Sequence, residues 1–111
     1  MRPAAIVAAV CAVLGIERSE LLGHSRHRKV VLGRMLVARV CRELTTMSFP
    51  EIARVLGRRN HSTVHCAHQR ICKLLERHAR VEDAIDGASV GGTMAIDEII
   101  EQVRRTARRS G

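Results

Sequence analysis

A short polar run near the middle of the chain carries the side chains best suited to recognising a nucleic acid: Asn60, His61, Ser62 and Thr63. Amide, imidazole and hydroxyl groups can hydrogen-bond to base edges in the major groove of DNA, and a threonine methyl can touch a thymine methyl. Arg58 and Arg59 directly precede the run and are suited to phosphate oxygens, as are the free amides at the start of a helix. The run therefore predicts a DNA site, although Asn60 or Ser62 could also serve only as a helix cap.

The residues on either side predict two helices joined by a tight turn. Ser48 is a suitable N-cap, and Pro50 suits the first turn of a helix that ends at Gly57, because glycine accepts the left-handed conformation of a helix end. A second helix is expected over residues 61–78, with Asn60 as its N-cap and apolar residues at helical spacing. Such a pair is a helix-turn-helix, whose second helix enters the major groove.

The rest of the chain predicts further helices and no strand-like alternation. Apolar residues at helical spacing place these helices at residues 3–14, 19–22, 30–45 and 94–109. Residues 81–86 could add one turn, and the glycine-rich residues 87–93 are interpreted as a flexible joint. The expected organisation is a helix-turn-helix domain over residues 1–86, the joint, and an amphipathic helix within residues 94–111. The apolar stripe of that helix could complete the same domain or pack against a second copy or a protein partner.

Positive charge is concentrated in the segment that holds the helix-turn-helix. The chain has a formal net charge of +8, and residues 24–80 contain thirteen of its 19 lysines and arginines, three acidic residues and all six histidines. This concentration indicates a polyanionic partner, nucleic acid before a membrane, and the alternative is a soluble domain with an unusually basic surface. One phenylalanine and no tyrosine or tryptophan leave no platform for stacking unpaired bases, so duplex DNA is favoured.

Two other groups of arginines are expected near DNA. Residues 24–29 are basic and lack apolar periodicity, so they are expected to form an exposed loop, from which Arg26 and Arg28 could enter an adjacent minor groove. An exposed basic loop without that role is the alternative. On the helix that follows, the arginines that leave the apolar stripe for solvent or phosphate are Arg34, Arg39 and Arg42.

No residue pattern predicts catalysis or a cofactor. No acid pair, nucleophile with a base, or glycine-rich phosphate loop stands out, so we expect no enzyme activity, no bound nucleotide and no cofactor. A metal site could be drawn from His61, His65 and His68 with Cys66. No further ligand or general base is suggested, and we expect no metal.

The cysteines and the apolar N-terminal segment indicate a cytoplasmic protein. The four cysteines form no CxxC pair and are interpreted as reduced thiols that pack as small hydrophobic residues. The apolar run over residues 4–16 is too short to span a bilayer and lacks the features of a signal peptide. We therefore expect a core helix there and no association with a membrane.

The stretch RELTTMSFPEIARVLGRRNHSTVHCAHQRI, residues 42–71, resembles the DNA-binding C-terminal domain of the bacterial chromosomal replication initiator DnaA. The resemblance covers about residues 4–80 and implies an all-α domain of roughly six helices with a helix-turn-helix, akin to the Trp-repressor group. It also implies a minor-groove role for Arg26, phosphate contacts for Arg34, Arg42, Pro50 and Arg59, base-reading positions at Asn60, His61, Ser62 and Thr63, and backbone support from Arg70.

Two departures from the family pattern bear on function. Asn60 stands where the family usually has aspartate, and Ser62 stands where it has threonine, which removes an acceptor for cytosine N4 and a methyl contact to thymine. We therefore expect a target sequence different from the family's standard box. The 111 residues hold no GxxxxGK[ST] loop and leave no room for an ATPase domain.

The function expected from the sequence is specific binding of duplex DNA by a DnaA-like factor without an ATPase. Such a factor would be associated with replication or regulate transcription, in the cytoplasm of a bacterium or from a phage, at the nucleoid. Met1 favours a complete small protein over a fragment. The alternative is a protein-interaction module whose basic surface binds nucleic acid only non-specifically.

Overall fold

The structure is a computed structural model in which residues 2–58, 60–77 and 95–110 are described. The helices in this part of the chain are α1 (Pro3–Leu14), α2 (Arg18–Leu22), α3 (Arg28–Leu44), α4 (Phe49–Val55), α5 (His61–Glu76) and α7 (Ile96–Ser110). The described residues form no β-strand. The predicted all-α fold of six helices is confirmed.

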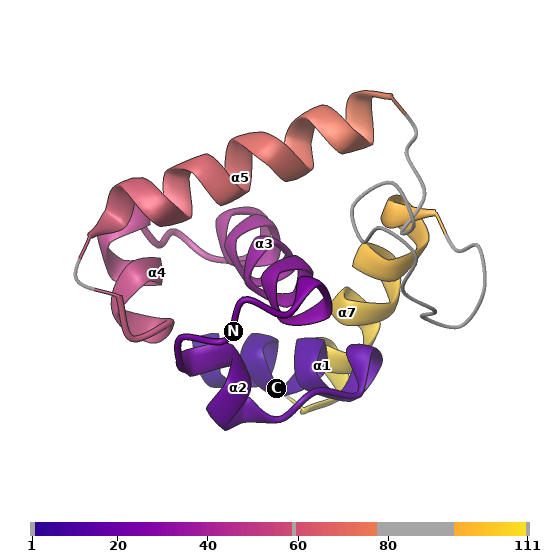
Figure 1. Ribbon diagram of the computed structural model, residues 1–111. Helices are drawn as coiled ribbons and strands as arrows, with labels where there is room; N and C mark the ends of the chain where they lie inside the picture. Colours follow the sequence, from indigo (N-terminus) through magenta and orange to yellow (C-terminus); the bar gives the residue numbers. More distant parts are fainter. Residues whose placement is uncertain (1, 59, 78–94, 111) are drawn as a thin grey trace.

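Helix α3 lies in the middle of the fold and packs against each of the other described helices (Figure 1). Helix α5 covers one side of it, and α1 covers the opposite side. The sequence predicted an apolar stripe with a residue at every fourth position of this helix, but Val37 and Ala38 are buried as well as Leu32 and Leu36. A helix enclosed from two sides buries most of its circumference, so periodicity underestimated its core.

Helix α7 closes the same core. Its apolar stripe, Ile96, Ile99, Ile100, Val103 and Ala107, is at most 2% exposed and packs mainly on α1. An ion pair between Arg104 and Glu43 joins α7 to the end of α3. Of the two arrangements expected for this helix, completion of the domain is the one found, and the stripe is not exposed for a second copy. The expected joint at residues 87–93 and the turn at 81–86 lie outside the described residues.

Helix α3 begins two residues earlier than its apolar pattern. His27 is its N-cap, and the imidazole Nδ1 accepts a hydrogen bond from the backbone amide of Lys29 at 3.3 Å. A side-chain acceptor can start a helix before the first buried residue. Arg28 and Lys29 therefore lie in the first turn of α3, and the basic loop is shorter than the expected residues 24–29.

Candidate nucleic-acid interface

The turn between α4 and α5 is built around Gly57. A capping box between Ser48 and Glu51 starts α4, as the sequence predicted for the N-cap. Gly57 has φ 69, and the amide of Arg58 then donates to the carbonyl of Ala53 at 2.7 Å, which ends the helix. A Cβ atom at Gly57 would lie 3.2 Å from the Leu22 carbonyl oxygen, so the turn packs directly against the end of α2.

The start of α5 presents its polar side chains to the solvent. Asn60 caps the helix, because its Oδ1 accepts from the Ser62 amide at 3.0 Å and from the Ser62 hydroxyl at 2.5 Å. Asn60, His61, Ser62 and Thr63 are all exposed, while Val64 behind them is buried. The helix cap is therefore present, and the amide nitrogen of Asn60 donates to none of the described residues. Arg59 lies outside the described residues.

One flank of α5 rests on Phe49. The guanidinium carbon of Arg42 lies 4.7 Å from the Phe49 ring centroid, and the rings of His65 and His68 meet the same ring edge-on at 4.9 and 5.3 Å. The spacing of Phe49 with Ile52 and Leu56 predicts a place in the core, but Phe49 is only half-buried, at the edge of the core. It joins α3, α4 and α5, and Pro50 beside it is exposed at the start of α4.

His68, which meets this ring, lies close enough to Arg39 to be affected by its charge. Burial lowers the pKa of His68, and the positive charges of Arg39 and Arg42 and the neighbouring His65 lower it further. Arg39 donates to Glu43 at 2.5 Å and to the Cys72 sulfur at 3.1 Å. Although the sequence placed Arg39 in solvent or on phosphate, its guanidinium is occupied by contacts within the chain.

On another flank of α5, Arg34 and Arg58 lie beside the helix and bind the loop between α2 and α3. Arg26 is exposed in this loop, and Arg28 is exposed at the start of α3. Arg34 is half-buried and donates hydrogen bonds to four backbone carbonyls at the end of α2 and in the loop. Arg58 donates to one of the same carbonyls, that of Gly23, at 2.5 Å. Burial lowers the pKa of Arg34, and the charge of Arg58 adds to the effect.

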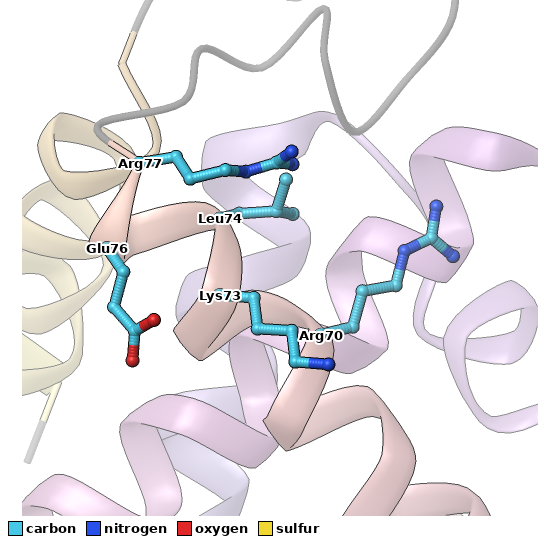
Figure 2. Close-up of a pocket in the computed structure, with 5 residues that line it drawn as sticks. All are labelled: Arg70, Lys73, Leu74, Glu76 and Arg77. Carbon is cyan, nitrogen blue, oxygen red and sulfur yellow. The ribbon is translucent and has the colours of Figure 1, made fainter.

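A cavity of about 280 Å³ opens on this flank, between α3 and α5. Its lining includes Arg34, Arg58, Thr63, Cys66 and Arg70, so it brings together four of the residues predicted to bind DNA. A larger hollow of about 460 Å³ follows along the helix, where Figure 2 shows Arg70, Lys73 and Arg77 extending from α5. Arg70, Lys73 and Arg77 give this stretch a net positive charge, although Glu76 also lines the hollow.

Two other classes of site are not formed by the described residues. No group of three or more histidine, cysteine, aspartate or glutamate side chains is arranged there to hold a metal ion. None of the described helices has both the length and the apolar character that crossing a membrane requires.

Sequence reasoning missed two features of this interface. It did not assign a role to Phe49 as a support for the exposed His65, although their positions near the starts of successive helices were visible. It also missed the carbonyl cluster that holds Arg34, because backbone acceptors occur at every residue and leave no signature in the sequence.

The fold and the exposed start of α5 define a helix-turn-helix domain. Residues 3–71 match the family model of the bacterial DnaA protein helix-turn-helix, and the chain belongs to this family. The resemblance inferred from residues 42–71 is confirmed.

Curated relatives of the chain are chromosomal replication initiator proteins DnaA. The protein from Thermus thermophilus is 39% identical over 80 residues, which are 72% of this chain and 18% of the relative. That of Corynebacterium jeikeium is 31% identical over 83 residues, 75% of this chain and 14% of the relative. That of Latilactobacillus sakei is 33% identical over 82 residues, 74% of this chain and 18% of the relative. The chain thus spans less than a fifth of the length of these relatives.

Proposed function

We propose that this chain binds duplex DNA in a sequence-specific manner, with the start of α5 in the major groove and the loop around Arg26 near the adjacent minor groove. The observation that carries the proposal is the exposure of four consecutive hydrogen-bonding residues, 60–63, at the start of the second helix of a helix-turn-helix. The family to which the chain belongs supports it. Free amides at a helix N-terminus also favour an anionic partner.

The distribution of ion pairs supports a polyanion at this surface. Arg39, Arg104 and Arg105 each pair with a glutamate on the side of the fold that holds the end of α3 and α7. Four of the seven arginines expected at the DNA surface make no ion pair with a described carboxylate: Arg26, Arg42, Arg58 and Arg70. Unneutralised cations around a helix end favour phosphate contacts, which supply affinity, while base contacts supply specificity.

The hydrogen bonds of Asn60 suggest which bases it would read. Both acceptor positions of its Oδ1 are used by Ser62, so its free group is the Nδ2 donor. A donor suits the acceptors of guanine, adenine N7 or thymine O4 and does not suit cytosine N4. The proposed target therefore differs from that of a family member with an aspartate at this position.

The relatives are named as replication initiators, and this supports a role in replication or in transcription at related sites. We propose that the chain reads DNA without hydrolysing a nucleotide, because these 111 residues include no phosphate-binding loop. The proposed place of action is the nucleoid of a bacterium, or of the host of a phage. The proposed DNA-binding unit spans residues 1–86, with α7 closing its core.

Selection of bound sequences from random duplexes tests the function, followed by gel shifts of the consensus in 50 to 200 mM salt. We expect one consensus and a loss of roughly a thousandfold in affinity over that range, for about seven phosphate contacts. The His61→Ala variant is the matched control, because it should weaken the sequence preference and keep the salt dependence. Binding that yields no consensus, or no binding to duplex DNA at all, would instead support a protein-interaction module whose basic surface contacts nucleic acid only non-specifically.

A further inference from the structure

Two arginines from different elements share one backbone acceptor behind the basic loop. Arg34 Nη2 donates to the Gly23 carbonyl oxygen at 2.9 Å, and Arg58 Nη2 donates to the same oxygen at 2.5 Å. The other acceptors of Arg34 are the carbonyl oxygens of Glu20 at 3.0 Å, Leu21 at 2.9 Å and Ser25 at 2.6 Å. One guanidinium in α3 therefore holds both the end of α2 and the first half of the loop.

The donors of Arg34 are nearly all used by these contacts. A guanidinium has five N–H groups, and Arg34 donates to four carbonyls. A bidentate pair with a phosphate needs two free parallel donors. Arg34 could form such a pair only by releasing carbonyls at the end of α2, which are helix-terminal groups that need a partner. Its geometry fits the backbone and not an external anion.

Arg58 connects this arrangement to the recognition helix. It follows Gly57 in the turn, where a Cβ atom would approach the Leu22 carbonyl oxygen to 3.2 Å. Its Nη1 is buried and has no hydrogen-bond partner among the described residues. The loop with Arg26 and the turn that leads to α5 are thus held to each other through Gly23, so the distance between the two proposed DNA-reading elements is fixed by contacts within the protein.

We propose that Arg34 is a positioning residue, which fixes Arg26 relative to the start of α5 and does not itself bind a phosphate. This inference rests on the proposed DNA binding and departs from the phosphate contact that the family resemblance implies for Arg34. A minor-groove arginine and a major-groove helix must meet a duplex at a fixed spacing, and Arg34 sets that spacing.

A double-mutant cycle with Arg26 tests the proposal. Arg34→Lys keeps the charge but cannot reach four carbonyls in the planar geometry of a guanidinium. If Arg34 acts through the loop, both Arg34→Lys and Arg34→Gln should weaken duplex binding about tenfold. This factor corresponds to about 1.4 kcal/mol, the loss expected when Arg26 no longer makes its base contact. Combined with Arg26→Ala, neither substitution adds more than about twofold to the loss.

Amide hydrogen exchange without DNA gives an independent measurement. In Arg34→Lys, exchange over residues 23–27 should accelerate about tenfold, while the buried part of α3 keeps its protection. Arg18→Lys, an exposed arginine of α2, is the matched control and should change neither exchange nor binding. If Arg34→Lys does not fold, the exchange experiment is carried out on Arg58→Lys, which removes one of the two donors to Gly23. The binding measurement then uses Arg34→Gln alone, because Arg58 is itself proposed to face DNA.

Two results would overturn the proposal. The first is a binding pattern typical of a phosphate contact. In that pattern Arg34→Lys keeps full affinity while Arg34→Gln loses it, or the loss in affinity from an Arg34 substitution multiplies with the loss from Arg26→Ala. The second is unchanged exchange over residues 23–27. If the wild-type protein does not bind duplex DNA, the proposed function fails, and the exchange experiment still decides whether Arg34 holds the loop.

Discussion

The side-chain oxygen Oδ1 of Asn60 accepts two hydrogen bonds from Ser62, one from its amide at 3.0 Å and one from its hydroxyl at 2.5 Å. The residue that caps the recognition helix is thereby also restricted in what it can offer to a base. Capping and base recognition at this position are coupled, because the acceptor is used by the helix and the donor is left for the partner.

The Asn60→Asp variant should therefore change sequence preference. A carboxylate has two oxygens, so one can cap α5 while the other accepts from cytosine N4. We expect selections on this variant to gain a cytosine at one position, with a discrimination of about 1–3 kcal/mol. Asn60→Ser keeps a cap but loses the amide donor and should lose preference at that position without gaining cytosine. Identical consensus sequences for the wild type and Asn60→Asp would contradict the assigned role.

The close approach at Gly57 can be separated from its backbone conformation. Gly57 and Gly15 have similar positive φ values of 69 and 66, but a Cβ at Gly15 meets nothing within 4 Å. Alanine at either site should lower the free energy of unfolding by about 1–2 kcal/mol from the left-handed conformation. Urea titration should show a larger loss for Gly57→Ala than for Gly15→Ala, and only Gly57→Ala should weaken DNA binding. Equal effects of both substitutions would show that the contact with Leu22 contributes nothing.

Stability should depend on pH through His68. Burial and then the charges of Arg39 and Arg42 hold its pKa below the ordinary 6.5, so the unfolded chain takes up the proton first as the pH falls. The contribution of His68 to stability is thus complete above pH 6.5 and is lost as the pH falls toward the pKa of the folded state. Urea midpoints measured between pH 7 and pH 5 should fall less in His68→Gln than in the wild type. His24→Gln, at an exposed loop position, serves as the control and should follow the wild type.

The cysteines offer a probe of the cavity flank. Cys66 is exposed and lines the cavity with Thr63 and Arg70, whereas Cys41 is buried and burial raises its pKa to about 12. A disulfide reagent at pH 8 should modify Cys66 quickly and Cys41 only on unfolding. Saturating duplex DNA should slow the modification of Cys66 at least tenfold, and Cys66→Ser should remove the fast phase. A rate that DNA leaves unchanged would exclude this flank from the interface.

The helices and caps of the helix-turn-helix could be predicted because local chemistry decides them. Ser48, Gly57 and Asn60 do in the structure what these residue types favour in any chain. The partners of Arg34 could not be predicted, since they are backbone carbonyls, and neither could the contact of Arg39 with Cys72, which only folding brings close. The pair of Arg39 with Glu43, four residues further along the same helix, could have been predicted from its spacing. An arginine in a basic segment was therefore assigned to phosphate, which is the common partner of such residues.

Phe49 shows a related limit. Helical spacing indicates the face of the helix on which a residue lies but not how deeply the residue is buried. Phe49 lies at the edge of the core, where Arg42 and His65 cover its ring. The base-reading roles of residues 60–63 stay predictions, and so does the phosphate contact assigned to Arg59.

The burial of α7 has a practical consequence for protein engineering. The family match ends at residue 71, yet five aliphatic and alanine side chains further along the chain cover α1. A chimera that borrowed the matched residues alone would leave bare hydrocarbon on α1, and we expect it to aggregate. Any graft of this domain onto another scaffold therefore has to carry α7 or supply a helix that shields the same surface.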